Sequence, residues 1–328
     1  MSGDGRPGEV LKQMPAGLDP DAWAWVTGQA LPGRRIVHTE RLAGGYRNDN
    51  LLLATDAGER LVLRRYLHTN ACAVEAALAG RLAGSVPVAE VVAADPTGEA
   101  AGQPLLLSRF VPGVLASTTL RTVTKVEAGA LGRAIGHTLA RIGETELARP
   151  GFFTGADLEP DPPGMEPAAD LPAFVERCLR TGPAEAALTP AELDAVRRLA
   201  AGSDPDLAPA RGARQLVHAD FNPKNLLVTR CDDGWAVAAV LDWEFAFSSS
   251  PLVDIGNMLR FADERPPAFT RGFLAGYEAG GGHLPDGWRR TSLALDLFSL
   301  ADFLTRPPDH HYFRRAVALL RRRTAELP

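Results

Sequence analysis

Apolar and polar positions alternate through the first third of the chain, a pattern typical of strands with one buried face. The alternation begins near Ile36. It predicts further strands over 51–55, 60–66, 90–94 and 103–110. An alanine-rich segment at 71–83 interrupts these strands and predicts a helix that ends at Gly84. This part of the chain is therefore expected to form an antiparallel sheet with one main helix.

The spacing of apolar residues becomes helical after Val111-Pro112-Gly113, which breaks the last strand. Within 123–146 apolar residues recur three or four positions apart and predict a long core helix. Further helices are expected over 170–180, 189–201 and most of 252–328. The pattern predicts an α+β fold in three parts: a β-sheet lobe over 1–108, a hinge over 109–113 and a larger, mainly helical lobe over 114–328.

One hairpin is expected inside the helical part. Residues 225–229 and 235–241 have the composition of two strands, and Asp233-Gly234 between them is a favoured turn dipeptide. Because the strands of a hairpin run antiparallel, Asn225 at the start of the first and Asp242 at the end of the second are expected to be neighbours.

The segment before this hairpin carries the strongest chemical signal. His218 precedes Asp220 by two positions, Asn225 follows Asp220 by five, and Asp242 ends the hairpin. The protein-kinase signature has the same arrangement. Phosphoryl transfer needs a carboxylate that accepts the hydroxyl proton and oxygen ligands for Mg²⁺. We interpret Asp220 as a catalytic base and Asn225 and Asp242 as metal ligands; in the alternative, Asp220 is a structural cap and His218 satisfies a buried carbonyl.

Other candidate residues lie in the β part. Gly44 and Gly45 fall between strands, where glycine lets backbone N–H groups approach a phosphate, although a plain hairpin turn would use the same residues. Val62 and Arg64 share one side of their strand, because side chains alternate between the two faces. An apolar side chain beside a cation suits a nucleotide, whose base lies next to its phosphates. A solvated arginine is the alternative. Glu75 in the following helix is expected to pair with Arg64, unless it is an ordinary exposed glutamate.

Composition narrows the partners. The chain has 328 residues, with 35 Lys and Arg against 40 Asp and Glu and a formal net charge of −5. A nucleic-acid partner is disfavoured, because phosphate backbones select basic surfaces. No stretch approaches the roughly 20 apolar residues of a membrane span, and the N-terminus lacks the apolar run of a signal peptide. The three cysteines are widely spaced, which suggests reduced thiols. We expect a cytoplasmic protein.

Together these motifs resemble the aminoglycoside phosphotransferase family, small-molecule kinases related to protein kinases. The resemblance covers about residues 36–305. Its most specific motifs are His218-Ala219-Asp220 with Asn225, and Asp242-Trp243-Glu244. Weaker matches are Gly44 to Asn48, Leu63-Arg64, Glu75, Phe110 to Gly113 and Asp254-Ile255-Gly256-Asn257. The resemblance implies a bilobal protein-kinase-like fold with a nucleotide-binding N-terminal lobe.

The resemblance also implies how the nucleotide is bound. ATP or GTP would be the phosphoryl donor, and the backbone of Arg109 and Val111 would contact its base. Arg64 would contact the phosphates, and Asn225 and Asp242 would ligate Mg²⁺.

Asp220 would be the catalytic base, and Asp254 would cap the helix that follows it. Two positions depart from the family pattern. Arg64 stands where many relatives have lysine, which should keep the phosphate contact but change its geometry. Ala219 replaces a common glycine, a change expected to be tolerated.

The leading hypothesis is an ATP- and Mg²⁺-dependent kinase that phosphorylates a hydroxyl of a small molecule, first of all an antibiotic. Acidic residues could receive a cationic substrate such as an aminoglycoside, although scattered carboxylates are usually just solvated: Asp157, Glu159, Asp161, Asp263, Glu264, Asp296 and Asp302. A metabolic kinase for an amino alcohol or sugar derivative stays open. A pseudokinase also stays open, but the complete Asp220, Asn225 and Asp242 set argues against it. The sequence favours neither a monomer nor a homodimer, and it assigns no role to residues 1–18 or to the basic C-terminal helix.

Overall fold

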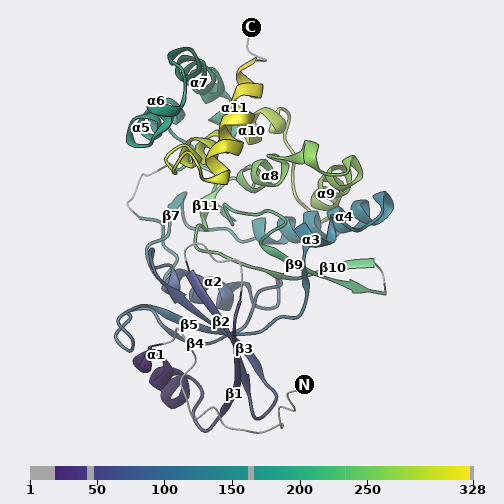
Figure 1. The fold of residues 1–328 in the computed structure, drawn as a ribbon. Coiled ribbons are helices and arrows are strands. Elements are labelled where there is room, and N and C mark those ends of the chain that lie inside the picture. Colours follow the sequence, from purple (N-terminus) through teal and green to yellow (C-terminus); the bar gives the residue numbers. More distant parts are fainter. Residues whose placement is uncertain (1–18, 43–47, 162–165, 233, 326–328) are drawn as a thin grey trace, which may run out of the picture. The chain divides into compact units, whose positions relative to one another are not determined.

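The structure is a computed structural model that describes residues 19–42, 48–161, 166–232 and 234–325. The chain divides into two compact units (Figure 1). Unit 1 contains the described residues of 1–119 together with 154–158 and 224–245. Unit 2 contains the described residues of 120–153, 159–223 and 246–328. The predicted α+β class is confirmed, whereas the lobe boundaries and the hinge stay predictions.

Unit 1 is built on a five-stranded antiparallel sheet with strand order β1-β2-β3-β5-β4 (Figure 1). Its strands are β1 (Ile36–Arg41), β2 (Asn48–Thr55), β3 (Arg60–Tyr66), β4 (Val91–Asp95) and β5 (Leu105–Arg109). Strands β2 to β5 confirm the strands predicted over 51–55, 60–66, 90–94 and 103–110, and β1 lies where the alternation begins, near Ile36. One face buries Leu53, Leu61 and Leu107 against helix α1 (Pro20–Trp25) and the π-helical turn at Val26–Ala30.

Helix α2 (Cys72–Leu82) lies on the other face of this sheet, where Tyr66 and Leu106 are buried beside Cys72. Successive residues of a strand point to opposite faces, so Arg64 shares the α2 face with Tyr66. The sheet therefore presents Arg64 to the helix that carries Glu75.

The predicted hairpin also belongs to unit 1, in a second sheet with order β10-β9-β6. Its strands are β6 (Val114–Leu115), β9 (Leu226–Cys231) and β10 (Gly234–Val240), and the short helix α3 (Ala116–Thr119) follows β6. Gly234 pairs with Cys231 as the first residue of β10, so it belongs to the strand rather than to the turn predicted at Asp233-Gly234. Gly234 has a φ of +118°, a conformation that favours glycine. Asp233 lies outside the described residues.

Unit 2 is mainly helical, as predicted. Its helices are α4 (Lys125–Gly143), α5 (Leu171–Thr181), α6 (Ala184–Ala187), α7 (Pro190–Ser203), α8 (Leu252–Leu259), α9 (Pro267–Ala279), α10 (Trp288–Phe303) and α11 (His311–Ala325). A small sheet of order β7-β11-β8 joins distant segments: β7 (Gly151–Phe152), β11 (Phe247–Ser249) and β8 (Gln215–Val217). Among the described residues, no helix combines the length and apolarity needed to cross a bilayer.

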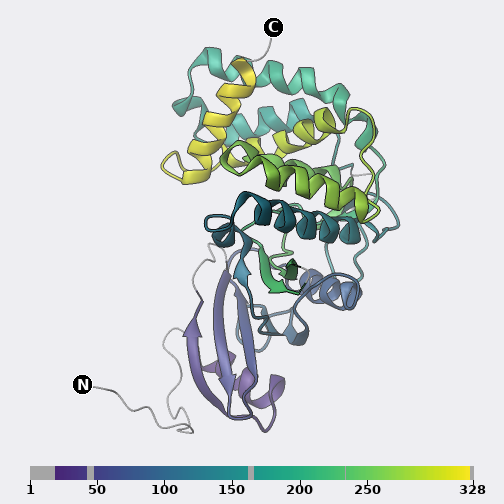
Figure 2. The same cartoon turned by 90° about the vertical axis from the view of Figure 1, so that its right-hand side faces the viewer.

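Helices α4 and α9 of unit 2 run side by side at very close approach (Figure 2). A Cβ added to Gly132 would lie 2.3 Å from the carbonyl oxygen of Phe269, and one added to Gly136 would lie 1.9 Å from that of Phe273. Backbones this close leave no room for a side chain at either glycine. The long helix predicted over 123–146 is confirmed as α4, and its glycines determine where α9 packs.

Candidate active site

Arg64 lies at the centre of a buried group of polar side chains in unit 1. Its Nη1 donates to both carboxylate oxygens of Glu75, each at 2.8 Å, which confirms the predicted pairing. Its Nη2 lies 3.0 Å from Asp242 Oδ1, and its Nε donates to Asn50 Oδ1 at 3.3 Å. One guanidinium therefore connects β3 with α2 and with the segment that follows β10.

Burial controls the charges of this group. It raises the pKa of Glu75 to about 7, although the nearby Arg64 opposes the shift. Burial alone would lower the pKa of Arg64, but the carboxylates of Glu75 and Asp242 outweigh it and raise that pKa. Arg64 is thus a fixed cation, which suits contact with a phosphate.

The hairpin brings Asn225 and Asp242 to the same end of its sheet, as predicted. The Leu241 N–H donates to the Asn225 carbonyl oxygen at 2.8 Å and extends the β9–β10 ladder. Asp242 has a φ of +68°, a left-handed conformation that aspartate tolerates better than most residues. Trp243 Nε1 donates to the Val240 carbonyl oxygen at 3.1 Å. These contacts fix the backbone that carries the Asp242 carboxylate.

The donor set at this end of the hairpin suits Mg²⁺. Asp242 Oδ1 is buried and forms the ion pair with Arg64 Nη2, but no N–H or O–H group of the described residues meets it with hydrogen-bond geometry. Within the same residues, no group of three or more His, Cys, Asp or Glu side chains could hold a metal by itself. Mg²⁺ usually takes one or two oxygens from the protein and the rest from phosphates and water. Asp242 and Asn225 therefore fit an ion that arrives with a nucleotide.

Two other residues predicted to bind the nucleotide, Val62 and Val111, are half-buried. Val62 is half-buried on the face of β3 that it shares with Arg64. Val111 follows β5 at a half-buried position. Gly44 and Gly45 lie outside the described residues, so their role stays a prediction.

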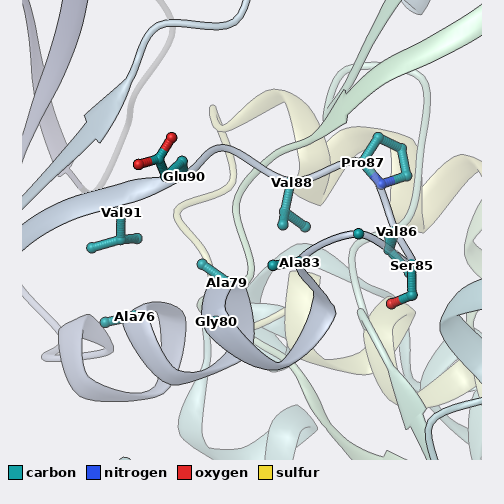
Figure 3. A pocket seen from close by; sticks show the side chains of 11 residues that line it. Ala76, Ala79, Gly80, Ala83, Ser85, Val86, Pro87, Val88, Glu90 and Val91 are labelled. Atoms are coloured by element: carbon teal, nitrogen blue, oxygen red, sulfur yellow. The ribbon is translucent and has the colours of Figure 1, made fainter.

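Arg109 ends β5 and is tied to Glu90 twice. Its N–H donates to the Glu90 carbonyl oxygen at 2.8 Å, and its Nε lies 3.0 Å from Glu90 Oε2. A backbone contact from Arg109 to a base therefore has to use its carbonyl oxygen. Glu90 also lines a hollow of about 890 Å³ beside α2, in which Val88 faces the helix (Figure 3). The rest of the lining is small or apolar: Ala76, Ala79, Gly80, Ala83, Gly84, Ser85, Val86, Pro87, Val88 and Val91.

In unit 2 the predicted catalytic loop follows β8. His218 is fully buried, and its Nδ1 accepts the N–H of Asp220 at 3.2 Å. His218 thus supports the backbone of the loop at Asp220. Asn222 Nδ2 donates to Asp220 Oδ1 at 2.8 Å and to the Asp220 carbonyl oxygen at 3.0 Å. A neutral donor thus orients the Asp220 carboxylate without cancelling its charge.

Helix α8 holds the residues before Asp220. Asp254 accepts the N–H groups of His218 at 2.7 Å and Ala219 at 2.8 Å, and Asn257 Nδ2 donates to the Ala219 carbonyl oxygen at 2.6 Å. The expectation that Asp254 caps the following helix is wrong, because it lies inside α8 and its buried carboxylate binds the loop. Burial raises the pKa of Asp254 to about 7, and the bound N–H groups oppose the shift.

Three asparagines of these groups, Asn50, Asn222 and Asn257, were not predicted from the sequence to act there. For Asn257 a usable signal exists: it and Asp254 are polar residues three positions apart in the otherwise apolar segment Leu252–Leu259. That spacing puts both on one helix face, and buried polar groups need partners. For Asn50 in β2 and Asn222 after β8 the sequence offers no comparable signal.

Comparison with known proteins covers most of the chain. The model of the phosphotransferase enzyme family matches residues 38–293. A mutant of aminoglycoside phosphotransferase APH(4)-Ia, solved with ADP and hygromycin B, is similar with a TM-score of 0.63 and 18% identity over 88% of this chain and 94% of that one. The GDP complex of an aminoglycoside 2′-phosphotransferase is similar with a TM-score of 0.64 and 17% identity, over 88% of this chain and 92% of that one. The macrolide 2′-phosphotransferase MphH from Brachybacterium faecium is similar with a TM-score of 0.58 and 19% identity, over 88% of this chain and 93% of that one. No curated protein sequence matches at a significant level.

Proposed function

Because the chain belongs to the phosphotransferase enzyme family, we propose that it transfers the γ-phosphoryl group of a nucleoside triphosphate to a hydroxyl of a small molecule, with Asp220 as the catalytic base. The observation that carries the assignment of Asp220 is the order of its loop. Asn222 orients its carboxylate, and Asp254 binds the two residues before it. Fixed geometry of this kind suits a group that must meet one particular hydroxyl.

The proposed reaction is one displacement at phosphorus. The acceptor oxygen forms a bond to the γ-phosphorus while the bond to the β–γ bridging oxygen breaks, the nucleoside diphosphate leaves, and the hydroxyl proton passes to Asp220. The proton is lost late in such a loose transition state, so Asp220 has to be ionised and positioned rather than strongly basic. Arg64, held by Glu75, supplies a cation to the phosphates.

Asn225 and Asp242 would hold Mg²⁺ with the nucleotide. When bound, the ion would supply positive charge that offsets the negative charge developing on the phosphates. Asn225 is neutral, so this pair brings one negative charge to the phosphates rather than two.

A cationic antibiotic is the first acceptor class to consider, because aminoglycoside and macrolide phosphotransferases share the fold. The carboxylates suggested for such a substrate are partly engaged within unit 2. Asp263 and Glu264 pair with arginines of α11, and the buried Asp296 lies between two arginines. This pairing favours a second class, a neutral hydroxyl compound such as a sugar derivative.

Release of nucleoside diphosphate across a panel of acceptors tests the proposal. The panel contains hygromycin B and other aminoglycosides, a macrolide, a peptide antibiotic, amino alcohols and neutral sugars, each with ATP or GTP and Mg²⁺. We expect release with one acceptor class, and a product that mass spectrometry finds heavier by one phosphoryl group. Binding of nucleotide without turnover of any acceptor would favour a pseudokinase and overturn the proposal.

A further inference from the structure

The last helix, α11, is rich in arginine, and most of its arginines form ion pairs at the surface. Arg322 pairs with Asp263, for example, and the two side chains are 52% and 53% exposed. Arg315 and Arg321 pair with Glu264 and Glu192 in comparable, largely solvated positions. Ion pairs of this kind contribute little to the free energy of folding, because water screens the charges.

Arg323 is different, because its pair is buried. Its Nη2 donates to Asp296 Oδ2 at 2.8 Å, with Arg323 13% and Asp296 0% exposed. The other oxygen of this carboxylate, Oδ1, accepts from Arg260 Nε at 2.7 Å, and Arg260 is 6% exposed. A carboxylate that is shielded from water has to be stabilised by the cations and hydrogen-bond donors around it. Asp296 of α10 therefore fixes Arg260, the residue that follows α8, and Arg323 of α11 at the same point.

Arg260 carries this arrangement to the catalytic loop. Its Nη2 donates to Asn257 Oδ1, and a guanidinium, which has only donors, determines which end of the asparagine amide faces it. The other end, Nδ2, then points its N–H at the Ala219 carbonyl oxygen, 2.6 Å away. Ala219 has a φ of +65°, so its conformation needs support from its surroundings.

We propose that Arg323 and Asp296 are positioning residues for the catalytic loop: through Arg260 and Asn257 they hold the Ala219 peptide group and thereby the carboxylate of Asp220, the next residue. The inference rests on the proposed role of Asp220. It gives the C-terminal helix a function that its composition does not suggest.

Arg323→Met and Arg322→Met make a matched pair, since both remove one guanidinium from neighbouring positions of α11. Hydrogen–deuterium exchange of the full chain compares the peptide 216–222 with a reference peptide from α4 and needs no acceptor. We expect Arg323→Met to speed exchange in 216–222 about fivefold, the size of one lost hydrogen bond, while α4 is unchanged. Arg322→Met should match the wild type, and Arg323→Lys should restore slow exchange, because lysine can still pair with Asp296.

A second variant covers the case in which Arg323→Met does not fold. Asn257→Asp keeps an acceptor for Arg260 but loses the N–H to Ala219, so it should also speed exchange in 216–222. With an acceptor identified, both variants should lower kcat and leave the KM for ATP unchanged. Equal exchange in the Arg323 and Arg322 variants, or equal acceleration in the α4 peptide, would overturn the inference. Failure of Asp220 as the base would appear in turnover of its own variant and not in the exchange data.

Discussion

The residue before the proposed base has an uncommon backbone conformation. Ala219 lies in the left-handed region with a φ of +65°, which strains a residue with a Cβ by about 1 kcal/mol. Asp254 and Asn257 bind its N–H and its carbonyl oxygen and hold it there. A glycine would adopt this conformation without strain, and alanine is tolerated here because α8 supports it.

Two substitutions at this position test that reading of the backbone. Ala219→Gly should leave the free energy of unfolding within about 1 kcal/mol of the wild type, because relief of strain and the greater freedom of glycine in the unfolded chain nearly cancel. Ala219→Val should lower it by about 2 kcal/mol, since a β-branched residue is rarely left-handed. Urea denaturation measures both. A valine variant as stable as the wild type would contradict the conformation.

Glu75 should make stability depend on pH. Burial raises its pKa from 4.5 to about 7, so between these values the folded state holds a proton that the unfolded state has lost. Its contribution to stability is therefore present below about pH 4.5 and is lost as pH rises to about 7.

Chemical denaturation of Glu75→Gln and the wild type at several pH values checks this. The difference in unfolding free energy, wild type minus variant, should fall by about 1 kcal/mol per pH unit between pH 5 and 7 and then level off. Glu99→Gln serves as the control, because it removes a glutamate at an exposed position. A pH-independent difference for Glu75 would show that its pKa is ordinary.

For single residues, the sequence predicts contacts between side chains of complementary chemistry on neighbouring elements. The pairing of Arg64 with Glu75 was predicted because strand and helix follow each other and the charges are opposite. The contact of Asp254 with the loop was not, because it joins segments 35 and 36 positions apart through backbone groups that carry no sequence signal.

Among the elements, the crossing of α4 and α9 depends on glycines that hydrophobic spacing does not reveal. The spacing within 123–146 predicted the helix and its buried side, but not how near another helix could come. Only glycine fits at position 136, because the Cβ of any other residue would clash with the backbone of α9.

Gly136→Ala should therefore lower the free energy of unfolding by about 3 kcal/mol, because the two helices have to separate. Gly80, inside α2, is the matched control, since a Cβ there meets no atom within 4 Å. Gly80→Ala should stabilise the protein by about 0.5–1 kcal/mol through helix propensity. Thermal unfolding of the two variants compares them directly, and a Gly136 variant that melts with the wild type would refute the close crossing.

The longer elements were predictable and the shortest were not. Strands of five or more residues in unit 1 show enough alternation to be recognised, and α7 is marked by Thr189 with Glu192 at its start. Strands β6, β7, β8 and β11 have two or three residues each. So short a segment has no period, and long-range pairing alone makes it a strand.

For the whole molecule, local sequence motifs were more informative than overall composition and net charge. The compound motif from His218 to Asp242 indicated the family that the match over 38–293 shows. The net charge of −5 said nothing of the ion pairs that engage both the acidic residues and the arginines of α11. The acceptor is not predictable in this way, because its recognition depends on how side chains from distant segments combine.

The most direct test of the account is phosphoryl transfer by Asp220→Asn with the acceptor that the wild type uses. Asparagine keeps the shape of the side chain but accepts no proton at neutral pH. We expect turnover to fall by about a hundredfold to ten-thousandfold, while calorimetry finds ATP binding nearly unchanged and Asp232→Asn, at an exposed position, behaves as the wild type. Near-normal turnover of Asp220→Asn would contradict the assignment of Asp220 as the base.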